Sequence, residues 1–328
     1  MLFVSNENHT DPALNLALEE YILKSLPGEE SYLLFYINEP SIIIGRNQNT
    51  VEEINSEYVE DAHIHVVRRL SGGGAVYHDL GNLNFSFITK DDGQSFHNFR
   101  KFTEPVIKAL RKLGIEAELT GRNDIQVGER KISGNAQFAT KGRMFSHGTL
   151  LFSSEIDNVV SALKANPEKY KSRSTKSIRS RVVNITELLE EPITIEQFKE
   201  VLLQSIYEGK DVPHYTLTSE DWLAVEALAN ERYRSWDWNY GRSPSFNLRQ
   251  NKRLPAGTFD VRLQVEEGRI TAAYVYGDFF GVGDANEFAA RLSGVRYDTS
   301  EVSDLLDSID LTYYFGPVTK EEWMGLLF

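Results

Sequence analysis

The chain has 328 residues, 41% of them hydrophobic and 25% charged, which is the composition of a soluble globular protein and excludes the disordered and fibrous classes. Its formal net charge of −13 makes general binding to nucleic acid or anionic membranes unfavourable. There are no cysteines, so disulfides, thiolate metal sites and thiol nucleophiles are excluded, and a reducing compartment such as the cytoplasm is expected.

The N-terminal residues lack the basic and then apolar pattern of an export signal, and no long uncharged apolar segment follows. Asp11 and Pro12 mark the start of a first helix. Short apolar segments then predict strands over residues 32–37, 41–44, 64–69, 82–89, 115–119, 124–127, 131–138 and 143–152, with a helix over 102–113. Neighbouring hairpins with helices outside them indicate an α+β fold on a mostly antiparallel sheet.

The second half of the chain changes character. Amphipathic patterns predict helices over residues 193–207 and 219–233. An aromatic, Gly and Pro-containing segment over 236–244 interrupts them, and a hairpin over 259–276 and further helices follow. We therefore expect a domain over residues 1–243 that carries the site and a small α+β domain over 244–328.

Three consecutive glycines follow two arginines in the segment Arg68 to Asp79. A run of glycines loses backbone entropy on folding, so a use must offset that loss. One use is a loop whose N–H groups approach phosphate or carboxylate oxygens, with Arg69 adding a fixed positive charge. The alternative is a tight turn, because neither of the common phosphate-binding fingerprints is present.

A second segment predicts a hairpin around Gly128-Glu129. In the simplest register the strand pairs are Val127–Arg130, Gln126–Lys131 and Asp124–Ser133. Side chains alternate along strands, so Asp124, Gln126, Lys131 and Ser133 are expected to share one face, with Lys131 diagonal to Asp124. Lys131 then either binds a substrate phosphate and carboxylate or forms only an exposed ion pair.

Two further features are weaker on their own. His147 and Thr149 are expected to face the same way on a strand, and His147 either borders the site or is structural. A basic segment opposed only by Glu168 is either a solvated loop or a flap over a phosphate; its cations are Lys164, Lys169, Lys171, Arg173, Lys176, Arg179 and Arg181.

Taken together, these segments resemble the lipoate-protein ligases over essentially the whole chain. The blocks that carry the resemblance are residues 15–20, 44–49, 68–79, 121–124, 130–134, 147–151 and 177–188. The resemblance implies a catalytic domain similar to those of biotin ligases and class II aminoacyl-tRNA synthetases, followed by an accessory domain.

The resemblance also implies roles for individual residues. Lys131 would contact ATP and the lipoate carboxylate, with Asp124 orienting it or holding Mg²⁺. The other expected ATP contacts are Arg69, Gly74, Ala75, Val76 and Tyr77. Lipoic acid would also meet Ser71, Gly72, Gly73 and His147, and Lys176, Arg179 and Arg181 would close over the adenylate.

The implied reaction is adenylation of lipoate by ATP, followed by transfer of the lipoyl group to a lysine. The implied acceptors are the lipoyl domains of 2-oxoacid dehydrogenase complexes or the glycine cleavage H protein. A biotin-type or octanoate ligase of the same fold, a hydrolase built on Lys131 and Ser133, and a silent lipoyl-domain binding protein are the alternatives. Octanoyl transferases that need a cysteine nucleophile are excluded because the chain has none.

Overall fold

A computed structural model describes residues 1–163, 181–240, 248–266, 268–297 and 299–328. The chain divides into two compact units. The first comprises Met1–Ile43, Val51–Arg68 and Val76–Asn239, and the second comprises Ile44–Thr50, Arg69–Ala75 and Tyr240–Phe328. The second unit therefore takes in two short loops from the N-terminal part of the chain besides the expected C-terminal segment.

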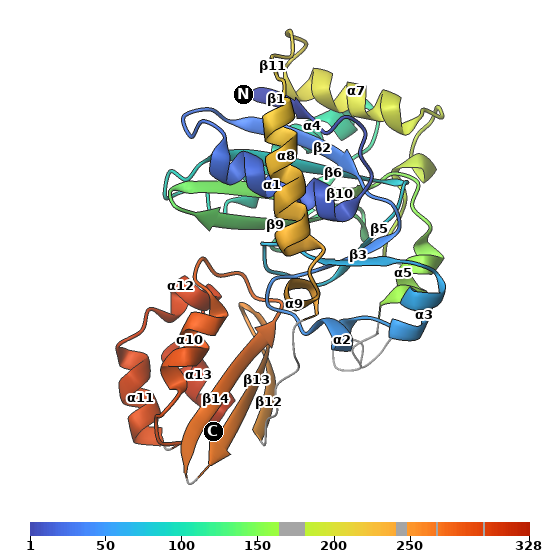
Figure 1. Ribbon diagram of the computed structural model, residues 1–328. Helices are drawn as coiled ribbons and strands as arrows, with labels where there is room; N and C mark the ends of the chain where they lie inside the picture. Colours follow the sequence, from blue (N-terminus) through green and yellow to red (C-terminus); the bar gives the residue numbers. More distant parts are fainter. Residues whose placement is uncertain (164–180, 241–247, 267, 298) are drawn as a thin grey trace. The chain divides into compact units, whose positions relative to one another are not determined.

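The first unit is built on an eight-stranded sheet with the order β11-β1-β2-β6-β10-β9-β8-β7 (Figure 1). Its strands are β1 (Leu2–Ser5), β2 (Tyr32–Ile37), β6 (Asn82–Lys90), β7 (Glu118–Thr120), β8 (Asp124–Val127), β9 (Arg130–Thr140), β10 (Arg143–Leu151) and β11 (His214–Tyr215). Strand β1 is parallel to both of its neighbours, and the other pairings in this sheet are antiparallel. The expected α+β fold on a mostly antiparallel sheet is confirmed.

A smaller sheet in the same unit has the order β4-β3-β5. Its strands are β3 (Ser41–Ile44), β4 (His65–Arg68) and β5 (Val76–His78). Short helices α2 (Thr50–Glu53) and α3 (Ser56–Asp61) lie between β3 and β4 in the chain, and α5 (Ile156–Ala162) contacts α3 and β5. The glycine-rich loop thus joins β4 to β5.

Helices cover both faces of the large sheet. Helix α4 (Phe99–Lys112) and helix α7 (Ile195–Ile206) contribute Val106, Leu110 and Phe198 to the main core, where they pack with Phe85 of β6. Helix α1 (Pro12–Ser25) lies on the other face, and Asp11 caps it by accepting bonds from the N–H groups of residues 13 and 14. This helix is buried along most of its length.

The outer side of α1 contacts α8 (Ser219–Leu228) and the π-helical turn Ala229–Tyr233, and the short helix α9 (Trp236–Asn239) follows (Figure 1). Tyr21 donates a hydrogen bond to Asp221 at 2.6 Å. The buried Glu20 carboxylate accepts from Tyr233 at 2.7 Å and also binds Lys24 and Arg232. These polar contacts fix α1, whose inner side faces the sheet.

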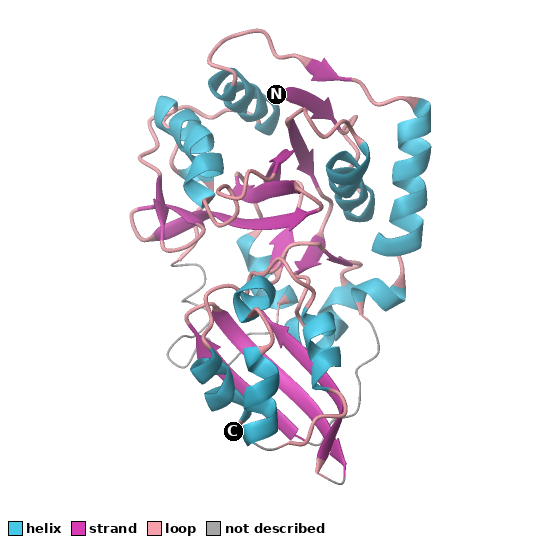
Figure 2. Ribbon diagram, turned by 90° about the vertical axis from the view of Figure 1, so that its left-hand side faces the viewer, coloured by secondary structure: helices cyan, strands magenta, loops and turns pink. Residues whose placement is uncertain are grey.

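The second unit has a three-stranded antiparallel sheet, β12 (Leu248–Leu254), β13 (Gly257–Glu266) and β14 (Arg269–Gly277). Helices α10 (Ala285–Leu292), α11 (Thr299–Asp307), α12 (Leu311–Phe315) and α13 (Lys320–Leu327) lie over one face of it (Figure 2). The aromatic side chains of Phe259, Phe279, Phe288, Phe315 and Trp323 form the centre of its core.

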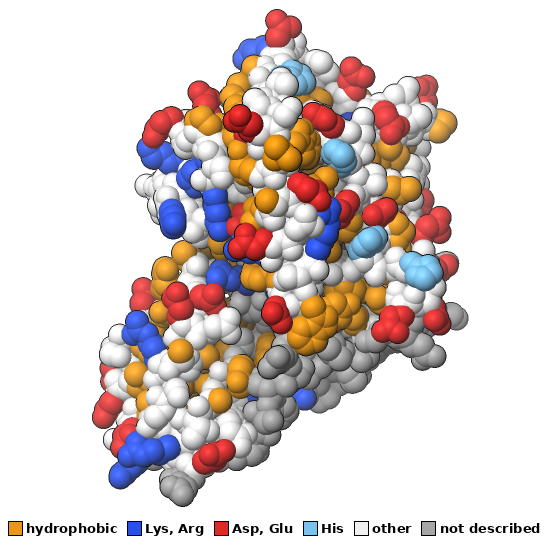
Figure 3. Space-filling model, in the orientation of Figure 1, with side chains coloured by type: hydrophobic (Ala, Val, Ile, Leu, Met, Phe, Trp, Pro, Cys, Tyr) orange, Lys and Arg blue, Asp and Glu red, His pale blue; other side chains and the backbone are white. Residues whose placement is uncertain are grey.

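On the molecular face drawn in Figure 3, acidic and basic side chains are interspersed. In the part of the chain that the structure describes, no helix combines the length and the apolar character that a membrane span requires.

Candidate active site

The β8–β9 hairpin carries the expected ion pair. The ammonium nitrogen of Lys131 lies 2.8 Å from a carboxylate oxygen of Asp124. The two side chains are 36% and 31% exposed, so the pair is reachable by a ligand. This geometry confirms that the two charges fix each other's position.

The strand register differs in one step from the simple hairpin. Val127 pairs with Arg130 and Gln126 with Lys131, as expected, but Asp124 pairs with Gly134 rather than with Ser133. The register shifts between Ile125 and Gln126, because β9 contains one extra residue there. The expectation that Ser133 shares the face of Lys131 is therefore wrong.

This shift matters for the chemistry. Ser133 pairs with Ile125, is fully buried, and accepts a hydrogen bond from the Asn135 side chain. Because Ser133 lies on the core face, it does not form a base and nucleophile pair with Lys131. Gly134 takes its place beside Asp124, and a Cβ atom at Gly134 would lie only 2.9 Å from the Lys131 ammonium nitrogen.

The loop that delivers Asp124 is held by a pair of asparagines that the sequence did not single out. The Asn123 side chain donates to the Asn135 carbonyl at 2.6 Å, and the Asn135 side chain donates to the Asn123 carbonyl at 3.0 Å. The Asn135 N–H also donates to the Asn123 carbonyl. These reciprocal bonds fix Asp124 relative to β9.

The backbone of Lys131 is bound on its other side by the segment that follows the basic stretch. The Lys131 N–H donates to the Arg181 carbonyl at 2.6 Å, and the Val183 N–H donates to the Lys131 carbonyl at 3.1 Å. Arg181, an expected flap residue, is thus next to Lys131 in the fold. The other two expected flap residues, Lys176 and Arg179, lie outside the described residues.

The face of the sheet that carries Lys131 continues to His147. The Gly134 N–H donates to the Thr149 hydroxyl at 3.2 Å, and Ala136 pairs with His147. Because side chains alternate along a strand, positions 134 and 136 of β9 share a face with Thr149 and His147 of β10. The structure therefore places His147 on the same face as the Lys131 ammonium.

His147 has a buried acidic partner. Its Nδ1 atom lies 2.9 Å from a carboxylate oxygen of Glu19 on α1, and the two side chains are 9% and 3% exposed. The ring of His147 also packs against Phe145 at a centroid distance of 4.7 Å. Sequence analysis missed Glu19, although a carboxylate within an otherwise apolar helix was a signal that could have identified it.

The glycine-rich loop belongs to the second unit, where Arg69 organises it. The Arg69 guanidinium donates to the carbonyls of Gly72 at 2.7 Å and Gly74 at 2.9 Å, and to the Ser71 hydroxyl at 3.0 Å. Arg69 is only 6% exposed. These three bonds tie Arg69 to its own loop.

The three glycines have different surroundings. A Cβ atom at Gly72 would lie 2.3 Å from the Phe279 carbonyl oxygen, and one at Gly73, where φ is +94°, would lie 2.8 Å from the Phe280 ring. Among the described residues other than its neighbours in the chain, a Cβ atom at Gly74 would meet nothing within 4 Å. Gly72 and Gly73 are thus required by packing, whereas Gly74 borders open space.

The expected nucleotide contacts continue into the first unit. Val76 and Tyr77 are in β5, where they pair with Ile43 and Ile42 of β3. Tyr77 is buried, and burial raises the pKa of its phenol. The residues expected to bind ATP are therefore divided between the two units, with Arg69, Gly74 and Ala75 in one and Val76, Tyr77 and Lys131 in the other.

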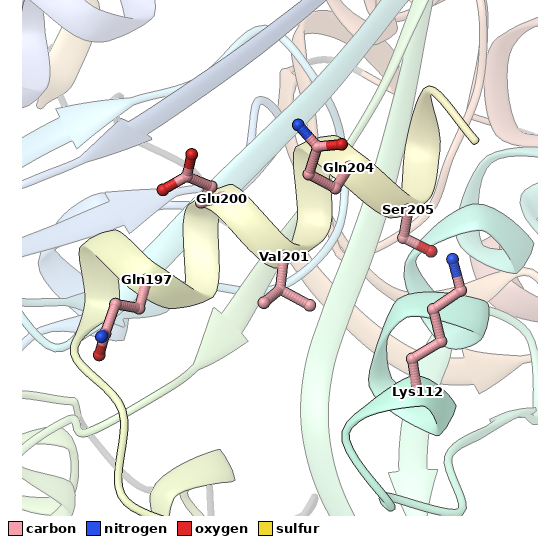
Figure 4. A pocket seen from close by; sticks show the side chains of 6 residues that line it. All are labelled: Lys112, Gln197, Glu200, Val201, Gln204 and Ser205. Carbon is pink, nitrogen blue, oxygen red and sulfur yellow. The ribbon is translucent and has the colours of Figure 1, made fainter. Parts of the chain in front are cut away.

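Metal ligands and cavities add little to this site. Among the described residues, no group of three or more His, Cys, Asp or Glu side chains could hold a metal ion. A surface groove of 360 Å³ between α4 and α7 is shown in Figure 4. None of its lining residues, Lys112, Gln197, Glu200, Val201, Gln204 and Ser205, is an expected site residue.

A positioned ammonium can hold two anionic groups together, as the activation of a carboxylate by ATP requires. The comparisons with known proteins make this specific. Residues 11–207 match the lipoyl protein ligase A/B catalytic domain, and residues 243–327 match the bacterial lipoate protein ligase C-terminus. The chain belongs to the lipoate-protein ligase family and is an enzyme of that class.

Similar proteins extend this finding over the full chain. Lipoate-protein ligase LplJ of Bacillus subtilis is 60% identical over 331 residues, with 100% of both chains covered. The structure resembles that of P. falciparum LipL1 in complex with lipoate, with a TM-score of 0.80, 26% identity and 94% of each chain covered. It also resembles lipoate-protein ligase A bound with ATP, with a TM-score of 0.62, 30% identity, and 74% of this chain and 97% of that chain covered.

Proposed function

We propose that this enzyme activates lipoate with ATP at Lys131 and transfers the lipoyl group to a lysine of an acceptor protein. The observation that carries the proposal is the Lys131 ammonium, fixed by Asp124 beside the space left by Gly134. The family to which the chain belongs and the lipoate-bound and ATP-bound neighbours support both substrates.

The first half-reaction joins two anions. A carboxylate oxygen of lipoate attacks the α-phosphorus of ATP, the bond from that phosphorus to the bridging oxygen breaks, and pyrophosphate leaves. Negative charge gathers at the carboxylate and the α-phosphate as they approach. A fixed ammonium between them offsets their repulsion without having to reorient during the reaction, so Lys131 acts on both substrates.

Asp124 has the role of orienting Lys131. Its carboxylate directs the ammonium over Gly134. Mg²⁺ is proposed as the partner of ATP. Such an ion takes most of its ligands from phosphates and water, so Asp124 could serve only as a single protein ligand.

The nucleotide is proposed to lie along the segment from Gly74 through Ala75 and Val76 to Tyr77. Gly74 borders open space, and Tyr77 is buried as a side chain, so contacts there use main-chain groups. Arg69 belongs to this ATP site through the loop that it holds.

Lipoate is proposed to extend from Lys131 along the sheet face that carries Thr149 and His147. Ser71, Gly72 and Gly73 are proposed to border it as well. Arg181, together with Lys176 and Arg179, is proposed to add positive charge over the adenylate. The backbone bond between Lys131 and Arg181 supports that role for Arg181.

In the second half-reaction, the uncharged amine of the acceptor lysine attacks the lipoyl carbonyl carbon. The bond to the AMP oxygen breaks, AMP leaves, and the amine loses a proton. We propose lipoyl domains of 2-oxoacid dehydrogenase complexes or the glycine cleavage H protein as acceptors, and we propose neither nucleic acid nor membrane as a partner.

We further propose that residues 1–243 form the catalytic domain, that residues 244–328 form the accessory domain, and that the enzyme works in the cytoplasm, where ATP is available. The two family matches, which end at residue 207 and begin at residue 243, support the boundary.

Exchange of labelled pyrophosphate into ATP tests the proposed first half-reaction. The purified protein is assayed with lipoate, octanoate, biotin or no acid. Exchange that depends on lipoate supports the proposal, and exchange with biotin alone indicates the biotin-type alternative. Acid-independent exchange, or none with any acid, contradicts it.

A further inference from the structure

The loop between β4 and β5 is shaped by contacts inside the second unit. Gly72 abuts the Phe279 carbonyl and Gly73 abuts the Phe280 ring. Phe279 and Phe280 are themselves buried, with exposed fractions of 0% and 5%. The loop therefore packs on a buried aromatic turn that follows β14.

A second loop braces the same segment. The Arg46 N–H donates to the Ser71 carbonyl at 2.9 Å, and a Cβ atom at Gly45 would lie 1.9 Å from the Gly73 carbonyl oxygen. The Arg46 side chain pairs with Asp284 at 3.0 Å. The loop with Gly72 and Gly73 therefore contacts Phe279 and Phe280, and the loop with Arg46 contacts Asp284. Both loops are thus positioned by residues 277–284.

Arg69 fixes the direction of the peptide groups in the loop. One guanidinium nitrogen, Nη2, binds the carbonyls of Gly72 and Gly74 together. In a trans peptide the N–H of the next residue points opposite to the carbonyl, and no described peptide bond is cis. The N–H groups of Gly73 and Ala75 therefore both point away from Arg69.

Two N–H groups turned to the same side form a site for anionic oxygens. Beside them, the Cβ direction of Gly74 is open with respect to the described residues, unlike those of Gly72 and Gly73. Arg69, in contrast, is buried behind the loop at 6% exposure.

We propose that Arg69 and Phe280 are positioning residues for this loop, and that Arg69 serves adenylation by holding the direction of the main-chain N–H groups that receive the nucleotide. This inference rests on the proposed function, because it concerns how the loop receives the nucleotide. It gives the second unit a specific part in the first half-reaction: its aromatic turn sets the shape of the loop.

Hydrogen exchange on the ligand-free protein separates the two roles of Arg69. Arg69→Lys keeps the positive charge but cannot reach three acceptors from one planar group, and Arg69→Gln removes the charge. If Arg69 holds the loop, both variants increase the exchange rate of the Arg46 amide, whose N–H donates to the Ser71 carbonyl, by about tenfold or more without any substrate. Unchanged exchange in both variants, with activity lost only in Arg69→Gln, overturns the proposal in favour of a direct charge contact.

Phe280→Ala tests the aromatic turn in the same way, with Phe280→Leu as a variant that keeps more of the buried volume. Faster exchange of the Arg46 amide and a KM for ATP raised about tenfold, with kcat changed much less, are expected for lost positioning. Phe328→Ala is the matched control, since that ring is 48% exposed and stacks on Tyr297 in the same unit.

A KM for ATP in Phe280→Ala and Phe280→Leu equal to that of Phe328→Ala would overturn the proposal. If the unaltered protein shows no lipoate-dependent pyrophosphate exchange, the proposed function fails instead. The hydrogen-exchange comparison still decides whether Arg69 and Phe280 hold the loop.

Discussion

Gly134 stands opposite Asp124 in the β8–β9 hairpin, and the space above it is filled by the end of the Lys131 side chain. One extra residue in β9 creates this arrangement, because without it Ser133 would take that position. The position of the ammonium therefore depends on a strand irregularity and on the absence of a side chain.

Gly134→Ala is expected to displace the Lys131 ammonium. The added Cβ atom would lie 2.9 Å from Nζ, which is the flexible end of a side chain, so the fold should tolerate the change. Adenylation should fall about tenfold, as expected when a charge that stabilises the transition state is misplaced. Gly28→Ala is the control, because its Cβ atom meets only ordinary contact at 3.7 Å. Equal exchange rates in the two variants would contradict the role of Gly134.

Asp124→Asn should separate orientation from stability. The ion pair is about a third exposed, so its loss should change the free energy of unfolding by less than about 1 kcal/mol. Pyrophosphate exchange should nevertheless fall about tenfold, because Lys131 loses its fixed direction. Glu129→Gln, at the exposed turn of the same hairpin, provides the comparison. A rate loss in both variants would point to a general charge effect.

The glycines of the loop should respond differently to the same substitution. At Gly72 a side chain collides with a backbone carbonyl, so Gly72→Val should lower the melting temperature of the second unit by several degrees. At Gly74 a side chain has room in the free protein, so Gly74→Val should melt normally but bind ATP more than about tenfold more weakly. Calorimetry with and without ATP measures both effects. Normal ATP affinity in Gly74→Val would show that the nucleotide does not approach there.

Acid should weaken the attachment of α1 through Glu20. Burial by itself raises the pKa of this carboxyl, but bonds from Lys24, Tyr233 and Arg232 outweigh burial and lower it below the ordinary 4.5. A lowered folded-state pKa means that the stabilisation is complete above about pH 4.5 and is lost as the pH falls through the lower folded value. Denaturant unfolding of Glu20→Gln should show a shallower loss of stability below pH 4.5 than the unaltered protein. Parallel curves would mean that Glu20 does not contribute.

The sequence predicted the elements whose signals are local. Residues 12–25 form the expected capped helix, and the hairpin turn at Gly128-Glu129 brings Lys131 and Asp124 together. Strand β1 and the edge strand β11 were missed, because each is very short and is defined by its neighbours rather than by its own pattern.

The remaining differences come from contacts that are distant in sequence. The pairing of Glu19 with His147 joins residues that are 128 positions apart. The packing of Gly72 on Phe279 likewise depends on how a loop and a C-terminal turn fit together. A run of glycines in the sequence indicates that another group comes close to the backbone. Only the structure shows whether that group is part of the protein, as at Gly72, or whether space is left for a ligand, as at Gly74.

Lys131→Ala tests the central claim most directly. The measurement is the rate of lipoate-dependent pyrophosphate exchange into ATP, with the fold monitored by the melting temperature. We predict an unchanged fold and a rate reduced about 10²- to 10³-fold, equivalent to about 3 to 4 kcal/mol of transition-state stabilisation. A variant that exchanges pyrophosphate as fast as the unaltered enzyme would contradict the proposal that this ammonium brings the two anions together.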